Sequence, residues 1–149
     1  MTKVSEIYDA ILASTVATLP TYTQMANPYV VEENPNMLFD KSFGLAFAPG
    51  VNTNRLAKPK LSRALDFDVI LINKINFTET NSAAANAQQK DMQEDLLLLQ
   101  KAYCNDGTIN DKASKFEYVA DNGIEYISNE KLKFYLLQAQ FTFEYFDDL

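Results

Sequence analysis

The sequence predicts an α+β fold, a mostly antiparallel β-sheet with an N-terminal helix and one long central helix packed on it. The main observation is the closing segment from Lys133 to Phe146, in which apolar and polar side chains alternate almost without a break. A period of two held for this long is typical of a half-buried strand well inside a sheet. Helical periods appear twice, at 4–19 and 83–104. The chain of 149 residues fits one domain, 1–149.

The first forty residues predict a helix followed by an irregular stretch. Apolar residues recur at helical spacing from Val4 to Leu19, and Pro20 closes the pattern. The stretch from Thr21 to Asp40 has no sustained period, and we expect at most a short strand there, from Tyr29 to Val31.

Two strands are predicted next, joined by a polar loop. Aromatic and small residues alternate from Phe43 to Ala48, and a Pro-Gly pair at 49–50 predicts a turn. Val51 to Arg63 is polar and is expected to be a loop. From Leu65 to Phe77 one face carries apolar residues at positions 67, 69, 71, 75 and 77, and from Val69 to Ile72 both faces are apolar. This strand should therefore be central and covered on both sides.

The second half predicts a helix, a hairpin and the closing strand. Ser82 is expected to cap a helix from Ala83 to Cys104, which a glycine turn at 105–107 ends. The Asp-Asn-Gly run at 121–123 lies between two short apolar stretches, and Asn-Gly favours a tight hairpin turn.

The composition is unfavourable for catalysis. The chain has no histidine, so Ser-His and Cys-His nucleophile activation and the usual neutral-pH proton shuttle are excluded. Cys104 is the only cysteine and is expected to be a structural thiol at a helix end. The sequence has no Walker loop, nucleophile elbow or dinucleotide fingerprint. We expect no enzyme, and no catalytic, cofactor-binding or metal-binding residue.

Charge and hydropathy limit the partners. The formal net charge of −7 argues against general nucleic-acid binding, because the phosphate backbone favours a basic surface. No apolar run is long enough to cross a bilayer or act as a secretion signal, so we expect a soluble protein made in a reducing cytoplasm, with no membrane partner. Asp66 and Asp68 share one strand face and could hold a divalent cation, but alternating acids are more often a wet strand face.

Two charged clusters are the candidate interaction residues. The basic cluster consists of Arg55, Lys58, Lys60 and Arg63. The acidic cluster consists of Glu144, Asp147 and Asp148, next to the terminal carboxylate. Each can be read simply as a solvated loop or tail. The functional hypothesis is docking, in which the basic loop of one subunit contacts the acidic terminus of the next and copies close head to tail into a ring.

The order and size of these elements resemble the tail terminator proteins of long-tailed bacteriophages, and more loosely the related tail tube and tail completion proteins. The features that match are the helix from Val4 to Leu19, the strand from Leu65 to Phe77, the helix from Ala83 to Cys104, and the strand from Tyr135 to Tyr145. They span most of the chain. The match is one of pattern, because the family has no diagnostic motif.

The resemblance implies a homo-oligomeric ring, expected to be a hexamer, in the neck of a virion. Such a ring binds the end of the tail tube, stops its polymerisation and offers a surface to the head-completion or connector protein, while DNA only passes through the lumen. The resemblance implies no catalytic residue and no cofactor, and it places the protein in the host cytoplasm during assembly. The alternatives are another neck or tail completion component, or a small non-enzymatic adaptor or inhibitor that binds one host protein.

Overall fold

The structure, a computed structural model, describes residues 3–25, 41–55, 60–75, 77, 80–128 and 133–148; at 48–55, 60–62, 147 and 148 it describes the backbone. The expected strand from Tyr29 to Val31 lies outside these residues. The elements are α1 (Lys3–Thr18), β1 (Thr23–Gln24), β2 (Lys41–Arg55), β3 (Lys60–Lys74), α2 (Ser82–Cys104), β4 (Lys115–Ser128) and β5 (Lys133–Asp148). The predicted α+β class is confirmed.

One five-stranded sheet organises these elements, in the order β1-β2-β3-β5-β4. All neighbouring strands are antiparallel except the short β1, which pairs in parallel with β2. The closing strand β5 lies between β3 and β4, so the prediction that it is inside the sheet is confirmed. Its register with β3 is unbroken from Lys60 opposite Asp148 to Lys74 opposite Phe134.

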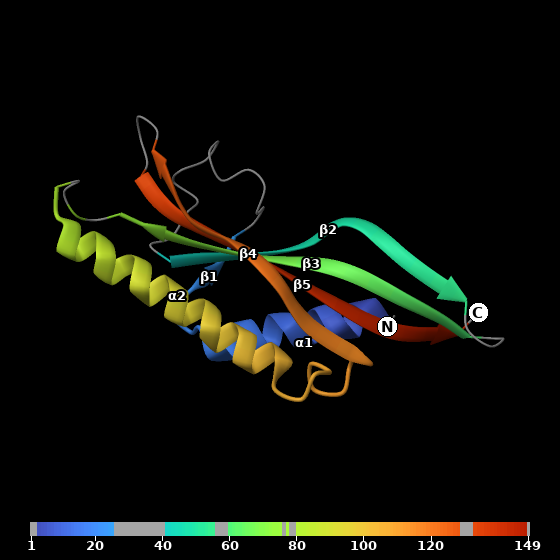
Figure 1. Ribbon diagram of the computed structural model, residues 1–149. Coiled ribbons are helices and arrows are strands. Elements are labelled where there is room, and N and C mark those ends of the chain that lie inside the picture. Colours follow the sequence, from blue (N-terminus) through green and yellow to red (C-terminus); the bar gives the residue numbers. More distant parts are fainter. Residues whose placement is uncertain are drawn as a thin grey trace.

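Both helices cover the same face of the sheet (Figure 1). The odd-numbered side chains of β5 point to this face because successive strand residues alternate sides. They form the main core together with Ile7 and Ile11 of α1 and with one stripe of α2. The buried residues of that stripe are Met92, Leu96, Leu99 and Tyr103. The long central helix therefore packs on the sheet as predicted, and α1 lies in the same layer.

A second, smaller apolar cluster lies on the opposite face of the sheet. It consists of Met25, Ile70, Ile72 and Phe134. Its presence explains why β3 is apolar on both sides from Val69 to Ile72, all of which are buried. The predicted central position of this strand is confirmed, although it ends at Lys74 and not at Phe77.

The prediction of a polar loop from Val51 to Arg63 is wrong. Strand β2 continues to Arg55 and β3 already begins at Lys60. The Pro-Gly pair at 49–50 does not turn the chain but lies in an irregularity where β2 has two more residues than β3, after which Val51 pairs with Leu65. Proline has no N–H for the ladder and glycine tolerates unusual dihedral angles, so the pair fits a bulge as well as a turn.

The hairpin predicted at 121–123 is also wrong. Residues 115–128 form one strand, β4, with two register shifts against β5. Gly123 has a positive φ of 72°, the conformation expected for a tight turn, but it accommodates an extra residue between Asp121 and Ile124. The Asn-Gly pair correctly predicted an unusual backbone conformation, but this conformation occurs in a β-bulge and not in a hairpin turn.

The ends of α2 differ slightly from the prediction. Asn81, not Ser82, is the N-cap, and its side-chain oxygen accepts a hydrogen bond from the Ala84 N–H at 3.1 Å. The helix ends at Cys104 as predicted, and Gly107 follows with a φ of 74°. The Cys104 thiol is half-buried, and burial raises its pKa, which agrees with a structural role.

The two helices are joined by a buried hydrogen bond, which gives a prediction. The Thr15 hydroxyl donates to the Ile11 carbonyl oxygen at 2.7 Å, so it accepts from the Tyr103 hydroxyl. Thr15→Val should cost about 1–3 kcal/mol of the free energy of unfolding, because it leaves a buried phenol without an acceptor. Tyr103→Phe should cost less, about 0.5–1.5 kcal/mol, since Thr15 keeps its bond to Ile11.

Urea unfolding of the two variants measures this order. The exposed Val16→Ala is a control for changes in helix propensity on α1. A larger loss for Tyr103→Phe than for Thr15→Val would contradict this account, in which the main cost is a buried phenol left without an acceptor.

Candidate interaction surface

The two charged clusters lie side by side at one end of the sheet. Because β3 and β5 are antiparallel, the start of β3 is next to the end of β5, and Lys60 pairs with Asp148 and Leu61 with Asp147. Arg55 pairs with Leu61 at the end of β2. Lys58 lies outside the described residues. We call the described strand ends, 55, 60–63 and 144–148, the mixed-charge end.

Two contacts hold the strands near the mixed-charge end. The Arg63 guanidinium lies over the Tyr145 ring, 5.8 Å from its centroid, which is a cation–π contact. Glu144 is half-buried, and its backbone carbonyl accepts hydrogen bonds from the Ser114 N–H at 2.8 Å and hydroxyl at 2.9 Å. These contacts fix the backbone of β5 close to the point where the acidic residues begin.

This arrangement changes how the clusters could be used. The sequence hypothesis assigned the basic cluster to one subunit surface and the acidic cluster to a different one. In the folded chain, β3 and β5 bring both clusters to the same end of one sheet. The strand ends that carry residues of both signs therefore lie next to one another.

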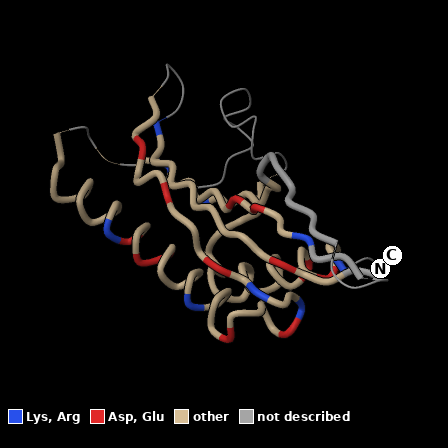
Figure 2. Tube along the Cα trace, turned by 45° about the vertical axis from the view of Figure 1, so that its right-hand side comes forward, with Lys and Arg blue, Asp and Glu red and all other residues tan. Residues whose placement is uncertain are grey.

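The sheet face opposite the helices is polar over much of its length. Its half-buried residues, which we call the polar sheet face, are Asp66, Asp68, Gln138, Gln140, Thr142 and Glu144. Figure 2 shows acidic residues spaced along the strands as well as along α2. The Gln138 amide donates to the Asp68 carboxylate at 3.0 Å. The six residues of the polar sheet face include three carboxylates and no cation; Lys115 of β4, the register partner of Glu144, lies beside them in an ion pair with Glu117.

Among the described residues, no group of three or more His, Cys, Asp or Glu side chains comes together. Burial raises the pKa of Asp68, with Asp66 adding to the effect and the Gln138 hydrogen bond opposing it. Asp66 and Asp68 lie half-buried on the polar face of β3.

The outer strand β4 presents exposed apolar side chains. Val119 is 49% exposed and Tyr126 is 52% exposed. Charged residues lie between them along the strand, and Lys115 pairs with Glu117 at 3.3 Å. The Tyr118 hydroxyl donates to Asp121; burial first, and then this carboxylate, raises the pKa of Tyr118 to about 12. Side-chain contacts with a partner are available along this whole strand.

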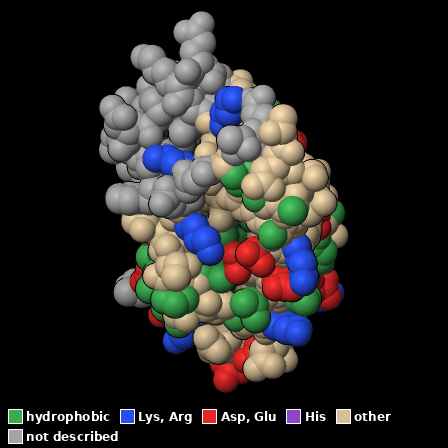
Figure 3. All heavy atoms as spheres, turned by 90° about the vertical axis from the view of Figure 1, so that its left-hand side faces the viewer, with side chains coloured by type: hydrophobic (Ala, Val, Ile, Leu, Met, Phe, Trp, Pro, Cys, Tyr) green, Lys and Arg blue, Asp and Glu red, His purple; other side chains and the backbone are tan. Residues whose placement is uncertain are grey.

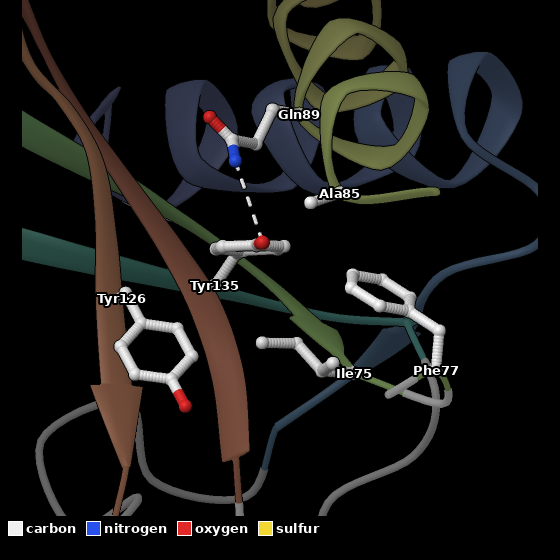
Figure 4. Close-up of a pocket in the computed structure, with 6 residues that line it drawn as sticks. All are labelled: Ile75, Phe77, Ala85, Gln89, Tyr126 and Tyr135. Carbon is white, nitrogen blue, oxygen red and sulfur yellow. Dashed lines mark hydrogen bonds between the residues drawn. The ribbon is translucent and has the colours of Figure 1, made fainter. Parts of the chain in front are cut away.

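A pocket of about 370 Å³ opens at the end of the sheet opposite the mixed-charge end (Figure 4). It lies between the start of α2, the end of β3 and the paired strands β4 and β5. Its lining residues are Ile75, Phe77, Ala85, Gln89, Tyr126 and Tyr135. On the described surface at this end of the molecule, apolar, basic and acidic side chains are intermixed (Figure 3).

The sequence reasoning did not identify this pocket. Its residues come from α2, β4, β5 and the segment after β3, and strand pairing brings Tyr126 and Tyr135 together. Tyr135 was assigned to the core face and Tyr126 to a hairpin. Phe77 was assigned to the apolar face of the strand from Leu65 to Phe77; it lies beyond the last residue of β3 and packs against the main core.

Comparison with known proteins finds similar chains among solved structures. No family model matches the chain, and no curated protein does. Among solved structures, the chain is similar to one in the virion of a native gene transfer agent particle, with 15% identity and a TM-score of 0.33 over 93% of this chain and 90% of that one. A TM-score this low supports no argument about fold or function. No helix in the described ranges is long and apolar enough to cross a membrane.

The raised pKa of Asp68 leads to a prediction about stability. An acid whose pKa is higher in the folded state favours the protonated form on folding, so its carboxylate reduces stability as the pH rises above its ordinary value near 4. Asp68→Asn should therefore leave the free energy of unfolding at pH 7 unchanged or higher, since an amide oxygen can still accept from Gln138.

Urea unfolding at pH 7 and pH 3 separates the two states of the carboxyl group. Any gain from Asp68→Asn should shrink at pH 3, where the wild-type group is protonated in both the folded and the unfolded chain. A clear loss of stability at pH 7 would mean that the structure uses the negative charge.

Proposed function

We propose that this chain is a non-enzymatic structural protein of a phage-like virion that forms a ring on the end of a tail tube. The ring stops polymerisation of the tube and offers the surface for joining the head. The main support is the polar sheet face, a broad acidic surface on β3 and β5 from which both helices are absent. Such a surface suits a position inside an assembly better than an active site.

The elements behind the resemblance to tail terminator proteins all exist in the folded chain. They are α1, β3, α2 and β5, and they occur in the expected order. The two strands are direct neighbours and the two helices form one layer, so the four elements make a single structural unit. The mispredicted segments lie mainly in β2 and β4, outside this unit, and the wrongly predicted loop also included the first residues of β3, from Lys60 to Arg63.

The charge of the polar sheet face suits the wall of a DNA channel. Affinity for DNA comes mainly from lysine and arginine contacts that release counterions from the phosphates. The three carboxylates of this face, without a cation among its six residues, provide no such contact. DNA would pass this surface without being held, as a conduit between head and tail requires.

An adaptor or inhibitor that binds one host protein is the second candidate. Leu97 and Leu98 are each 47% exposed on α2, on the side of the helix away from its buried stripe. Two adjacent exposed leucines favour a protein contact, but a ring or neck component would use them equally well. Another neck or tail completion component would share the same surfaces.

Assembly on tubes tests the proposal and the charged residues together. Added during polymerisation of the tube protein from the same genome, the chain should give shorter tubes with a cap visible at the tip by negative-stain electron microscopy. Lys58→Glu with Lys60→Glu should weaken capping most at low salt, and should change the thermal midpoint little if both lysines are exposed.

The matched control reverses two charges elsewhere, Lys90→Glu with Lys101→Glu on the exposed side of α2. It should cap tubes like the wild type. Unchanged tube length and bare tips with the wild-type chain would reject the ring proposal, whereas loss of folding in the Lys58 and Lys60 variant would show a structural role for these residues.

The position of the polar sheet face can be tested by labelling. In a Cys104→Ser background, Gln140→Cys introduces a thiol on this face and Ala87→Cys introduces one on the exposed side of α2. In assembled rings, a small maleimide should still reach residue 140, whereas a maleimide on a long polyethylene glycol chain should not. Residue 87 should react with both reagents.

Each pattern of labelling has one meaning. Reaction of residue 140 with both reagents would place the polar sheet face on the outside of the ring. Reaction with neither would place it in a subunit interface, and either result would reject the channel wall.

A further inference from the structure

The pocket at the start of α2 has the size of a binding site for one ring-bearing side chain. A cavity of about 150 Å³ is enough to hold benzene, and ligand pockets begin at about 300 Å³. The pocket of about 370 Å³ can therefore hold one substituted ring with part of the chain that bears it. Aromatic and aliphatic side chains and Gln89 line it, and none of these described lining residues is charged.

Aromatic rings form three sides of the pocket (Figure 4). Tyr126 and Tyr135 are tilted toward each other at 60°, with their ring centroids 6.1 Å apart. Phe77 lies on the other side of Tyr135 in this view, and Ile75 and Ala85 complete the apolar wall. Edge-to-face contacts with an incoming ring are favourable in such a site.

One polar pair at the pocket wall favours a ligand whose aromatic ring carries a hydroxyl group. The Gln89 amide nitrogen donates to the Tyr135 hydroxyl oxygen at 3.3 Å. Among the described residues, the Tyr135 hydroxyl proton and the Gln89 amide oxygen have no further partner. The pair therefore offers one donor and one acceptor close together. A phenol hydroxyl can both accept and donate, so it matches this pair, whereas a plain phenyl ring leaves both groups unpaired.

We propose that this pocket binds a tyrosine side chain of a partner protein. The partner enters beside β4, where half of the Tyr126 side chain remains exposed at the mouth of the pocket. The lack of charge in the wall argues against a phosphate, a carboxylate or a cation as ligand. This proposal does not depend on the oligomeric ring proposed above, because the mixed-charge end lies at the other end of the sheet.

The test uses N-acetyl-tyrosine amide as probe and N-acetyl-phenylalanine amide as the analogue that lacks only the hydroxyl. The methyl signal of Ile75, labelled for NMR, should shift on titration with the tyrosine probe, with a dissociation constant on the order of 1 mM for so small a ligand. The phenylalanine analogue should bind about tenfold more weakly, since it leaves the Tyr135 hydroxyl and the Gln89 amide oxygen without a partner.

Two variants on one helix provide the matched comparison. Ala85→Leu fills the pocket and should abolish the shift, whereas Ala87→Leu, two residues later on the exposed side, should leave it unchanged. Gln89→Leu should remove the preference for tyrosine over phenylalanine. Tyr126→Ala removes a half-exposed side chain, so it should keep the fold and weaken both probes.

The outcomes decide the proposal directly. Equal affinity of the wild-type chain for the two probes would overturn the tyrosine specificity. Normal binding by Ala85→Leu, or equal loss in Ala85→Leu and Ala87→Leu, would overturn the pocket as the site. If a second copy of the chain supplies the tyrosine, Ala85→Leu will also lower the sedimentation coefficient at high protein concentration, and an unchanged value assigns the partner to another protein. The tube-capping assay, carried out with Ala85→Leu, tests the oligomeric ring separately from the tyrosine pocket.

Discussion

The unbroken antiparallel ladder between β3 and β5 is the constraint on which the rest of the structure depends. Fifteen consecutive pairs, from Lys60 with Asp148 to Lys74 with Phe134, fix which side chains face the helices and which face away. A shift of one residue would move Phe141 and its neighbours from the core to the polar sheet face. The position of the helices, the mixed-charge end and the pocket all follow from this register.

The sequence correctly predicted the strands and helices whose apolar pattern results from burial. It failed at glycine-containing pairs, which occur both in turns and in bulges. The alternation in β5 and the two-sided apolar run in β3 report directly which faces are covered. The Pro-Gly and Asn-Gly pairs report only an unusual backbone conformation, and bulges use it as readily as turns. The pairing strand decides between the two uses, and that strand lies far away in the sequence.

Buried polar contacts join the layers and could not be read from the sequence. The Tyr22 hydroxyl donates to Asp95 of α2 at 2.7 Å and accepts from Asn73 of β3 at 2.9 Å. Burial raises the pKa of this phenol, so it stays protonated and keeps both bonds at neutral pH. Asn73 is part of no local motif. Its role follows from being on the helix-covered face of β3, and this requires the three-dimensional register.

The two bulges in β4 have a consequence for the behaviour of the protein at high concentration. Edge strands with a regular outer ladder can pair with the same strand of another molecule and grow into fibres. The extra residues at Val119 and between Asp121 and Ile124 bend the outer ladder of β4 at two places, so that a straight strand cannot follow it. At this edge of the sheet, molecules can then meet through side chains but not through a continuous backbone ladder.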